Sequence, residues 1–136
     1  MPTGYSGRPL GAKLGLKEGQ RAWRSGMPAS VAAEIEVEVP GLAFLAEPAP
    51  GLDVAHIFTT SRIALEAELA RLRPLLAPAG MIWVSWPKKA SKVPTDITED
   101  IVREVAFPHG LVDVKVCAVD ATWSGLKLVV RKALRT

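Results

Sequence analysis

Hydroxyl and positively charged side chains follow two apolar segments of the sequence, 53–59 and 81–86. Hydroxyls, ammonium groups and the backbone amides of a helix start together suit a phosphate or a carboxylate. In open α/β sheets ligands bind at the carboxyl ends of the strands, so we expect these groups to form an anion site there. The candidate ligand-binding residues are Thr59, Thr60, Ser61, Ser85, Trp86, Lys88, Lys89, Asp96 and Trp123.

Several of these residues also have a purely structural explanation. Thr60 and Ser61 stand where a helix N-cap is expected, and Asp96 suits a turn cap better than an acid or base. Lys88 and Lys89 fit a solvated loop. The sequence leaves both interpretations open at each of these positions.

The tryptophans are expected to differ in their roles. Trp83 and Trp86 lie on opposite faces of a regular strand, so we expect Trp83 in the core and Trp86 over the crevice. Turns rarely need a tryptophan, so we expect Trp123 to pack over the helix 98–107 or to form an interface.

No complete catalytic motif is present. The sequence has no Gly-x-Ser-x-Gly elbow, P-loop or His-Glu-x-x-His, so no catalytic residue is assigned. His56 is expected to be a core histidine, His109 to lie at a helix end, and Cys117 to act as a small hydrophobe. These three residues lie far apart in the sequence, and no metal site is predicted.

The elements that position these residues alternate between strands and helices. Strands are predicted at 20–24, 42–46, 53–59, 81–86, 111–119 and 126–131. Helices are predicted at 10–16, from Pro28, from the Ser61 cap and from the Thr98 cap. Alternation of this kind predicts a three-layer, Rossmann-like α/β fold with about six mostly parallel strands. The last two strands are joined too closely for a crossover, so they should form an antiparallel hairpin.

This order resembles the fold of Rossmann-like methyltransferases. Leu76-Ala-Pro-Ala-Gly80 before a central strand and Asp53-Val54 at the head of another are similar to pieces of that fold. The resemblance implies the spatial strand order 2-1-3-4-6-5 and S-adenosylmethionine as an alternative cofactor. Its cofactor-binding residues would be Gly26 in the turn after strand one and Glu47 after strand two. A single glycine and a single acid predict a degenerate cofactor site.

Longer motifs resemble a family of small bacterial proteins defined only as a domain of unknown function (DUF 3052). The resemblance covers nearly the whole chain but implies no known activity. Its motifs are Gly-Tyr-Ser-Gly-Arg-Pro-Leu near the N-terminus, Leu14-Gly-Leu-Lys-Glu-Gly19, Trp86-Pro-Lys-Lys89, Thr95-Asp-Ile-Thr-Glu99, Leu111-Val-Asp-Val-Lys-Val-Cys-Ala-Val-Asp120 and Trp123-Ser-Gly-Leu126.

Size and charge narrow the classes of protein further. The 136 residues suit a single domain at 10–136 behind a flexible arm at 1–9, and 49% hydrophobic residues exclude a disordered chain. One cysteine excludes an internal disulfide, and no apolar run could span a membrane or act as a secretory signal, which predicts a cytoplasmic protein. The net charge is only +3 and RNA-type aromatic motifs are absent, so nucleic acid is not an expected partner.

The sequence therefore predicts a non-catalytic bacterial α/β protein without a cofactor. It would bind a protein partner or an anionic small molecule at the carboxyl ends of the strands. The alternative is a methyltransferase-like enzyme that binds S-adenosylmethionine.

Overall fold

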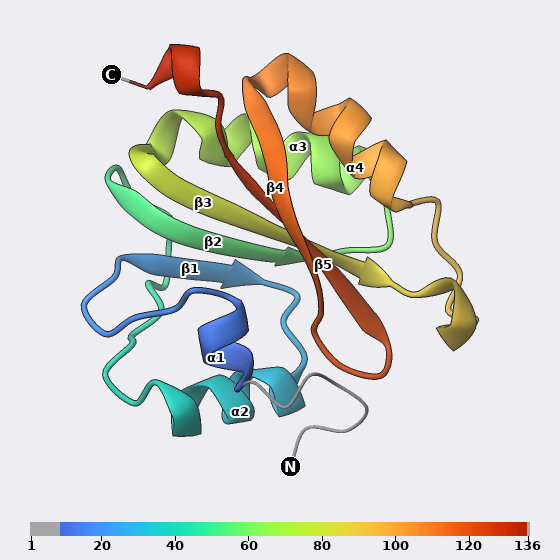
Figure 1. The fold of residues 1–136 in the computed structure, drawn as a ribbon, viewed down its shortest axis with the longest axis horizontal. Coiled ribbons are helices and arrows are strands. Elements are labelled where there is room, and N and C mark those ends of the chain that lie inside the picture. The colour runs from blue at the N-terminus through green and yellow to red at the C-terminus, as the bar shows by residue number, and fades with distance from the viewer. Residues whose placement is uncertain (1–8, 136) are drawn as a thin grey trace.

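The computed structural model describes residues 9–135, which form a three-layer α/β domain around one mixed sheet (Figure 1). Within this range the strands run in the order β1-β2-β3-β5-β4. The strands are β1 Ala22–Ser25, β2 Leu52–Phe58, β3 Leu76–Pro87, β4 Leu111–Ala118 and β5 Trp123–Val130. The α-helices are α1 Leu10–Lys13, α2 Ala29–Glu38, α3 Arg62–Leu72 and α4 Glu99–Ala106. The short 3₁₀ turns are η1 Arg73–Leu75, η2 Lys89–Ser91, η3 Phe107–His109 and η4 Lys132–Leu134. The flexible arm predicted at 1–9 lies almost wholly outside the described residues.

The first three strands are parallel, and β5 pairs antiparallel with both β3 and β4. This confirms the predicted Rossmann-like sheet with a closing hairpin. The predicted strand at 42–46 is wrong, because only Phe44 forms a bridge, parallel to Ala22 beside β1. Pro40 and Pro48 bracket that segment, and proline cannot donate the ladder hydrogen bonds of a longer strand. With Phe44 at the edge, the remaining order matches the predicted 2-1-3-4-6-5.

Two apolar layers cover the sheet. Helices α3 and α4 lie on one face and α1 and α2 on the other, as Figure 1 shows. Alternate residues of β3 supply the two layers: Ile82, Val84 and Trp86 face α3 and α4, whereas Met81 and Trp83 face α1 and α2. Trp83 is fully buried and its indole donates to the carbonyl of Leu14, which confirms its predicted place in the core.

Both central helices begin at the predicted caps. The Ser61 hydroxyl accepts from the amide of Ala64, and the Thr98 hydroxyl accepts from the amide of Ile101. On α3, Ile63 is 83% exposed. The buried face of α3 is formed by Leu65, Leu69 and Leu72, which follow each other at helical spacing.

The parallel strands carry their carboxyl ends to a single edge of the sheet. The arrowheads of β1, β2 and β3 point toward this edge in Figure 1, and the loop after β3 lies beyond it. The fold therefore brings the turns after these three strands, and the start of β5, to one end of the domain.

Candidate functional site

A cleft of ≈ 640 Å³ lies at the carboxyl end of β3, and we name it the lysine cleft. Its volume falls within the range of roughly 300–1,000 Å³ that is common for small-molecule sites. It lies where the end of β3 pairs with the start of β5, at Trp86↔Ser124 and Pro87↔Trp123. The residues that line it are Trp86, Pro87, Lys88, Lys89, Lys92, Val93, Pro94, Thr95, Ile97, Thr98, Glu99 and Ser124.

Buried apolar side chains and exposed ammonium groups meet in the lysine cleft. Trp86 and Ile97 line it while being only 7% and 2% exposed, so their side chains are held by the core. Lys89 and Lys92 are exposed on the loop above. The arrangement places buried apolar walls beside exposed positive charges, which suits a ligand with an apolar body and an anionic group.

The single acid that lines the lysine cleft is engaged elsewhere. Glu99 forms an ion pair with Arg103 one helical turn later. Arg103 also binds Asp100 at 2.9 Å and Asp113 at 3.0 Å. The hydrogen bonds that Arg103 donates to Asp113 and then to Glu99 raise the pKa of its guanidinium. The lining of the cleft therefore keeps a positive electrostatic character.

The loop that carries the lysines is tied to the β4–β5 turn. The Lys88 ammonium group donates to the carbonyl of Asp120 at 2.7 Å, and the Lys88 amide donates to the carbonyl of Thr122 at 2.7 Å. The Asp120 carboxylate in turn accepts from the amides of Thr122 and Trp123 at 2.8 Å each. These contacts give Lys88 a positioning role in the loop, in addition to its place in the cleft.

Lys92 has a left-handed backbone with φ of 61°, and it is the one non-glycine residue with positive φ within 9–135. The η2 turn before it is closed by hydrogen bonds from Ser91 and Lys92 to the carbonyls of Lys88 and Lys89. A left-handed conformation costs an L-residue roughly 1–2 kcal/mol. Lys92 is not among the candidate ligand-binding residues that the sequence predicts.

The turn after β2, which carries Thr59, Thr60 and Ser61, is hydrogen-bonded to the segment before α4. Asp96 accepts from the amide of Arg62 at 2.8 Å, so its carboxylate caps the start of α3 beside Ser61. The Thr95 hydroxyl donates to the carbonyl of Thr60 at 2.8 Å, and the Thr59 hydroxyl accepts from the amide of Ser61 at 3.2 Å. These residues share the strand-end edge with the lysine cleft, although of this turn and its partners only Thr95 lines it.

Ser85 is fully buried and hydrogen-bonded to His56, with 2.7 Å between Ser85 Oγ and His56 Nε2. His56 is 3% exposed and stacks on Phe58 with 4.2 Å between ring centroids. Burial lowers the pKa of His56 to about 3, so the imidazole is neutral at physiological pH. His56 is thus the satisfied core histidine that the sequence predicts, whereas Ser85 lies within a strand that continues to Pro87.

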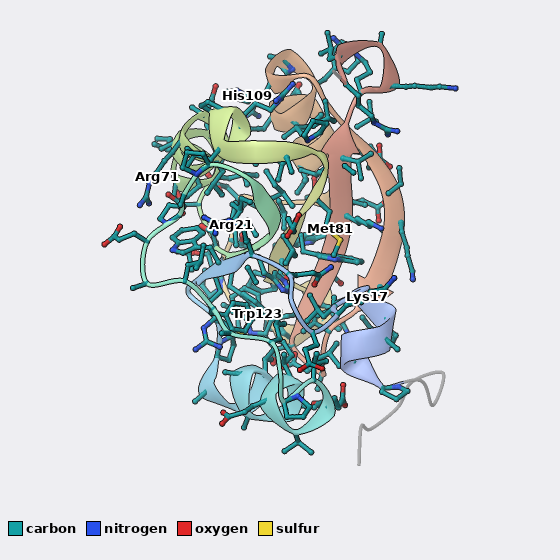
Figure 2. The ribbon with its side chains drawn as sticks, turned by 90° about the vertical axis from the view of Figure 1, so that its left-hand side faces the viewer. Lys17, Arg21, Arg71, Met81, His109 and Trp123 are labelled. Carbon is teal, nitrogen blue, oxygen red and sulfur yellow. The ribbon has the colours of Figure 1, made fainter. Side chains whose placement is uncertain are left out.

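Trp123 packs on the face opposite the one expected. Its ring meets Phe58 edge-on, with 5.2 Å between centroids, among the residues that α1 and α2 cover. Figure 2 shows Trp123 on the α2 side of the sheet, away from Arg71 and His109 on the α3 and α4 side. The expectation that Trp123 packs over the helix 98–107 is therefore wrong, because the strand parity of β5 directs it to the other layer.

The turn after β1 contains Gly26 with φ of +68°, and an ideal Cβ at this position would lie 2.5 Å from the carbonyl oxygen of Phe58. Only glycine fits this turn without moving the end of β2. The Glu47 side chain is 85% exposed and pairs with Arg71 of α3 at 3.7 Å. The two predicted cofactor residues thus contact different elements. Gly26 lies against the end of β2, and Glu47 pairs with a residue of α3.

A second cleft, of ≈ 520 Å³, lies at the opposite end of the sheet, and we name it the opposite cleft. Figure 2 views the molecule from this end, where the parallel strands begin, and labels Lys17 and Met81 from its lining. Lys17 and Lys127 line it together with Glu18 and Asp53, so two lysines face two acids. Its charges balance, unlike those of the lysine cleft.

Solved structures with a similar fold include several methyltransferases. The mitomycin 7-O-methyltransferase MmcR aligns with a TM-score of 0.65 at 13% identity, over 82% of this chain and 48% of that one. Human N-acetylserotonin methyltransferase, solved in complex with SAM (S-adenosylmethionine), gives 0.60 at 13% identity, over 82% and 47%. The fibrillarin pre-rRNA processing protein of Methanococcus jannaschii gives 0.54 at 10% identity, over 94% and 71%. The chain thus spans about half the length of the first two proteins.

No family model matches the chain, and no curated protein matches it. The comparisons support the resemblance to the methyltransferase fold and add nothing for the domain of unknown function. The prediction that no cofactor is involved is contradicted, since the similar structures include methyltransferases and the human enzyme was solved with SAM. Within residues 9–135 no helix is long and apolar enough to cross a membrane.

Proposed function

We propose that this chain is a methyltransferase-like domain that binds S-adenosylmethionine at the carboxyl ends of β1 and β2. The observation that supports it best is the strand order, Phe44-β1-β2-β3-β5-β4 with an antiparallel closing hairpin. The similar solved structures include methyltransferases, one of them in complex with SAM. The lack of a catalytic motif agrees with this chemistry, since the cofactor carries the reactive methyl group.

The turn after β1 fits such a cofactor in part. Gly26 keeps the backbone of this turn close to the end of β2. The turn leads into α2, whose N-cap Pro28 makes no side-chain cap hydrogen bond and whose first turn has no acid. The amides at this helix start, with the positive end of the helix dipole, would favour a carboxylate such as that of the methionine part of the cofactor.

Glu47 would serve a cofactor ribose only after leaving Arg71. Both side chains are largely exposed, at 85% for Glu47 and 47% for Arg71. Exposed ion pairs contribute roughly 0–1 kcal/mol, so ligand hydrogen bonds to Glu47 would offset the loss of this pair. Glu47 therefore stays a candidate ribose ligand, but its side chain must first move away from Arg71.

The test is a calorimetric titration with SAM, with S-adenosylhomocysteine and with ATP. We expect saturable binding of the first two ligands and weaker binding of ATP, which shares the adenosine but lacks the methionine part. Gly26→Ala should abolish binding, because its Cβ displaces the turn from Phe58. Gly19→Ala is the matched control: Gly19 also has positive φ, at +90°, but no atom lies within 4 Å of its Cβ position. Both variants are compared at a temperature where circular dichroism shows them folded.

Absence of SAM binding by the folded wild-type chain would overturn the proposal. Equal binding by the Gly26→Ala variant would overturn the assignment of the site to this turn.

A further inference from the structure

We propose that the lysine cleft is a separate binding site for an organic anion, a phosphate or carboxylate carried on a flat apolar body. The inference stands apart from the proposed SAM site, which lies at the ends of β1 and β2. The lysine cleft lies at the end of β3, and Gly26 and Glu47 are not part of its lining.

The walls of the cleft select the apolar body of the ligand. Trp86 and Ile97 belong to the core layer under α3 and α4, and their exposed remainders face the cleft. Val93 and Pro94 complete an apolar wall on the loop side. A planar hydrocarbon body between such walls removes apolar surface from water on both sides of the ligand.

The lysines of the cleft favour a negatively charged ligand. Three lysines line this cleft, and its one acid, Glu99, is paired with Arg103. The opposite cleft has a similar volume, but Glu18 and Asp53 offset its two lysines. An anion is therefore attracted to the lysine cleft more strongly than to the other cleft of comparable size.

Hydrogen bonds within the protein fix the conformation of the lysine loop without a ligand. Lys88 is tied to the β4–β5 turn, and the η2 turn holds Lys89 and Lys92 at its two ends. Lys92 keeps its left-handed backbone at an energetic cost, which is the kind of strain that tends to occur at functional sites. Pre-organisation of this kind lowers the entropy lost on binding.

The test is an amide NMR titration of the full chain, without SAM, with phenyl phosphate, benzoate, inorganic phosphate and benzyl alcohol. We expect the two aromatic anions to shift the amides of Ser124 and of the non-proline residues in 86–99, and to bind more tightly than either the bare ion or the neutral alcohol. Tighter binding of phenyl phosphate than of benzoate would identify the anionic group as a phosphate. Tighter binding of benzoate would identify it as a carboxylate. Because no cofactor is present, failure here leaves the SAM proposal untouched.

Two matched double variants separate the clefts. Lys89→Gln with Lys92→Gln should weaken binding of the preferred aromatic anion about tenfold or more. Lys17→Gln with Lys127→Gln removes the same charge from the opposite cleft and should leave the affinity unchanged. A third variant, Lys92→Gly, removes one charge and also relieves the strained backbone, because glycine adopts positive φ readily. Weaker binding by this variant could therefore not be explained by a loss of folding. Equal losses in both double variants, shifts confined to the opposite cleft, or no saturable shifts would each overturn the proposal.

Discussion

The buried pair of His56 and Ser85 predicts a loss of stability in mild acid. His56 has its pKa lowered from 6.5 to about 3 by burial, and its Nε2 lies 2.7 Å from the Ser85 hydroxyl. Below pH 6.5 the unfolded chain binds a proton at this imidazole and the folded chain does not. Stability from this group is therefore full above pH 6.5 and falls as the pH drops toward 3.

The size of this effect follows from the width of the pH window. Each pKa unit corresponds to about 1.4 kcal/mol, so the full window between 6.5 and about 3 amounts to about 5 kcal/mol. At pH 5 the unfolded state is already protonated, and the expected loss is about 2 kcal/mol. A loss of that size is a large fraction of the roughly 5–15 kcal/mol that stabilises a typical domain.

Urea unfolding curves at pH 8, 6, 5 and 4.5 measure this loss. His56→Gln removes the titrating group and keeps a polar partner for Ser85. The pH-dependent loss should therefore be smaller in this variant by about 2 kcal/mol at pH 5. His109→Gln, which leaves His56 in place, is the matched control and should keep the full loss. If His56→Gln folds poorly, the apolar pair His56→Phe with Ser85→Ala replaces it. Parallel pH curves for wild type and the His56 variant would refute a buried neutral histidine.

Two further predictions concern the packing of the two layers. Trp83→Phe leaves the buried carbonyl of Leu14 without the indole donor, and should lower the free energy of unfolding by about 1–3 kcal/mol. Urea unfolding curves measure this loss. No change would mean that a water molecule replaces the indole as the donor to this carbonyl. Leu65→Ala should lower the free energy of unfolding by about 2–5 kcal/mol because Leu65 is fully buried. Ile63→Ala on the same helix should change it by no more than about 0.5 kcal/mol, because Ile63 is exposed. Similar losses at both positions would contradict the observed buried face of α3.

Local signals in the sequence predict the helix starts and the location of the cleft. The Ser61 and Thr98 caps depend on neighbouring residues alone, so the structure reproduces them. The cleft at Trp86 to Lys89 is predicted for the same kind of reason, since a proline ends the strand and lysines follow it. The burial of Ser85 is not predicted from the sequence, because it depends on long-range strand pairing. The sequence predicts Ser85 near the strand end, but pairing of β3 with β5 extends the strand to Pro87, and Ser85 is fully buried.

The partners of the site residues lie beyond what sequence spacing can predict. Asp96 caps a helix start 34 residues earlier in the chain, and the residue that meets Ser85 is 29 positions away. The contact between His56 and Ser85 depends on the register between β2 and β3, which pairs Phe58 with Ser85 and His56 with Trp83. A shift of this register by one residue would turn every side chain of the strand to the other face. Register is a property of the assembled sheet and has no local marker in this sequence.

Alternation along β3 explains how one strand end serves both the core and a cleft. Ser85 turns toward His56 on the α1 and α2 side, where His56 stacks on Phe58 and Phe58 meets Trp123 edge-on. Trp86, one residue later, turns to the α3 and α4 side and lines the lysine cleft. The sheet thus separates the buried polar pair from the proposed anion site. Charge changes at Lys89 and Lys92 should therefore alter ligand affinity without altering the pH dependence that His56 produces, and a common effect on both would contradict this separation.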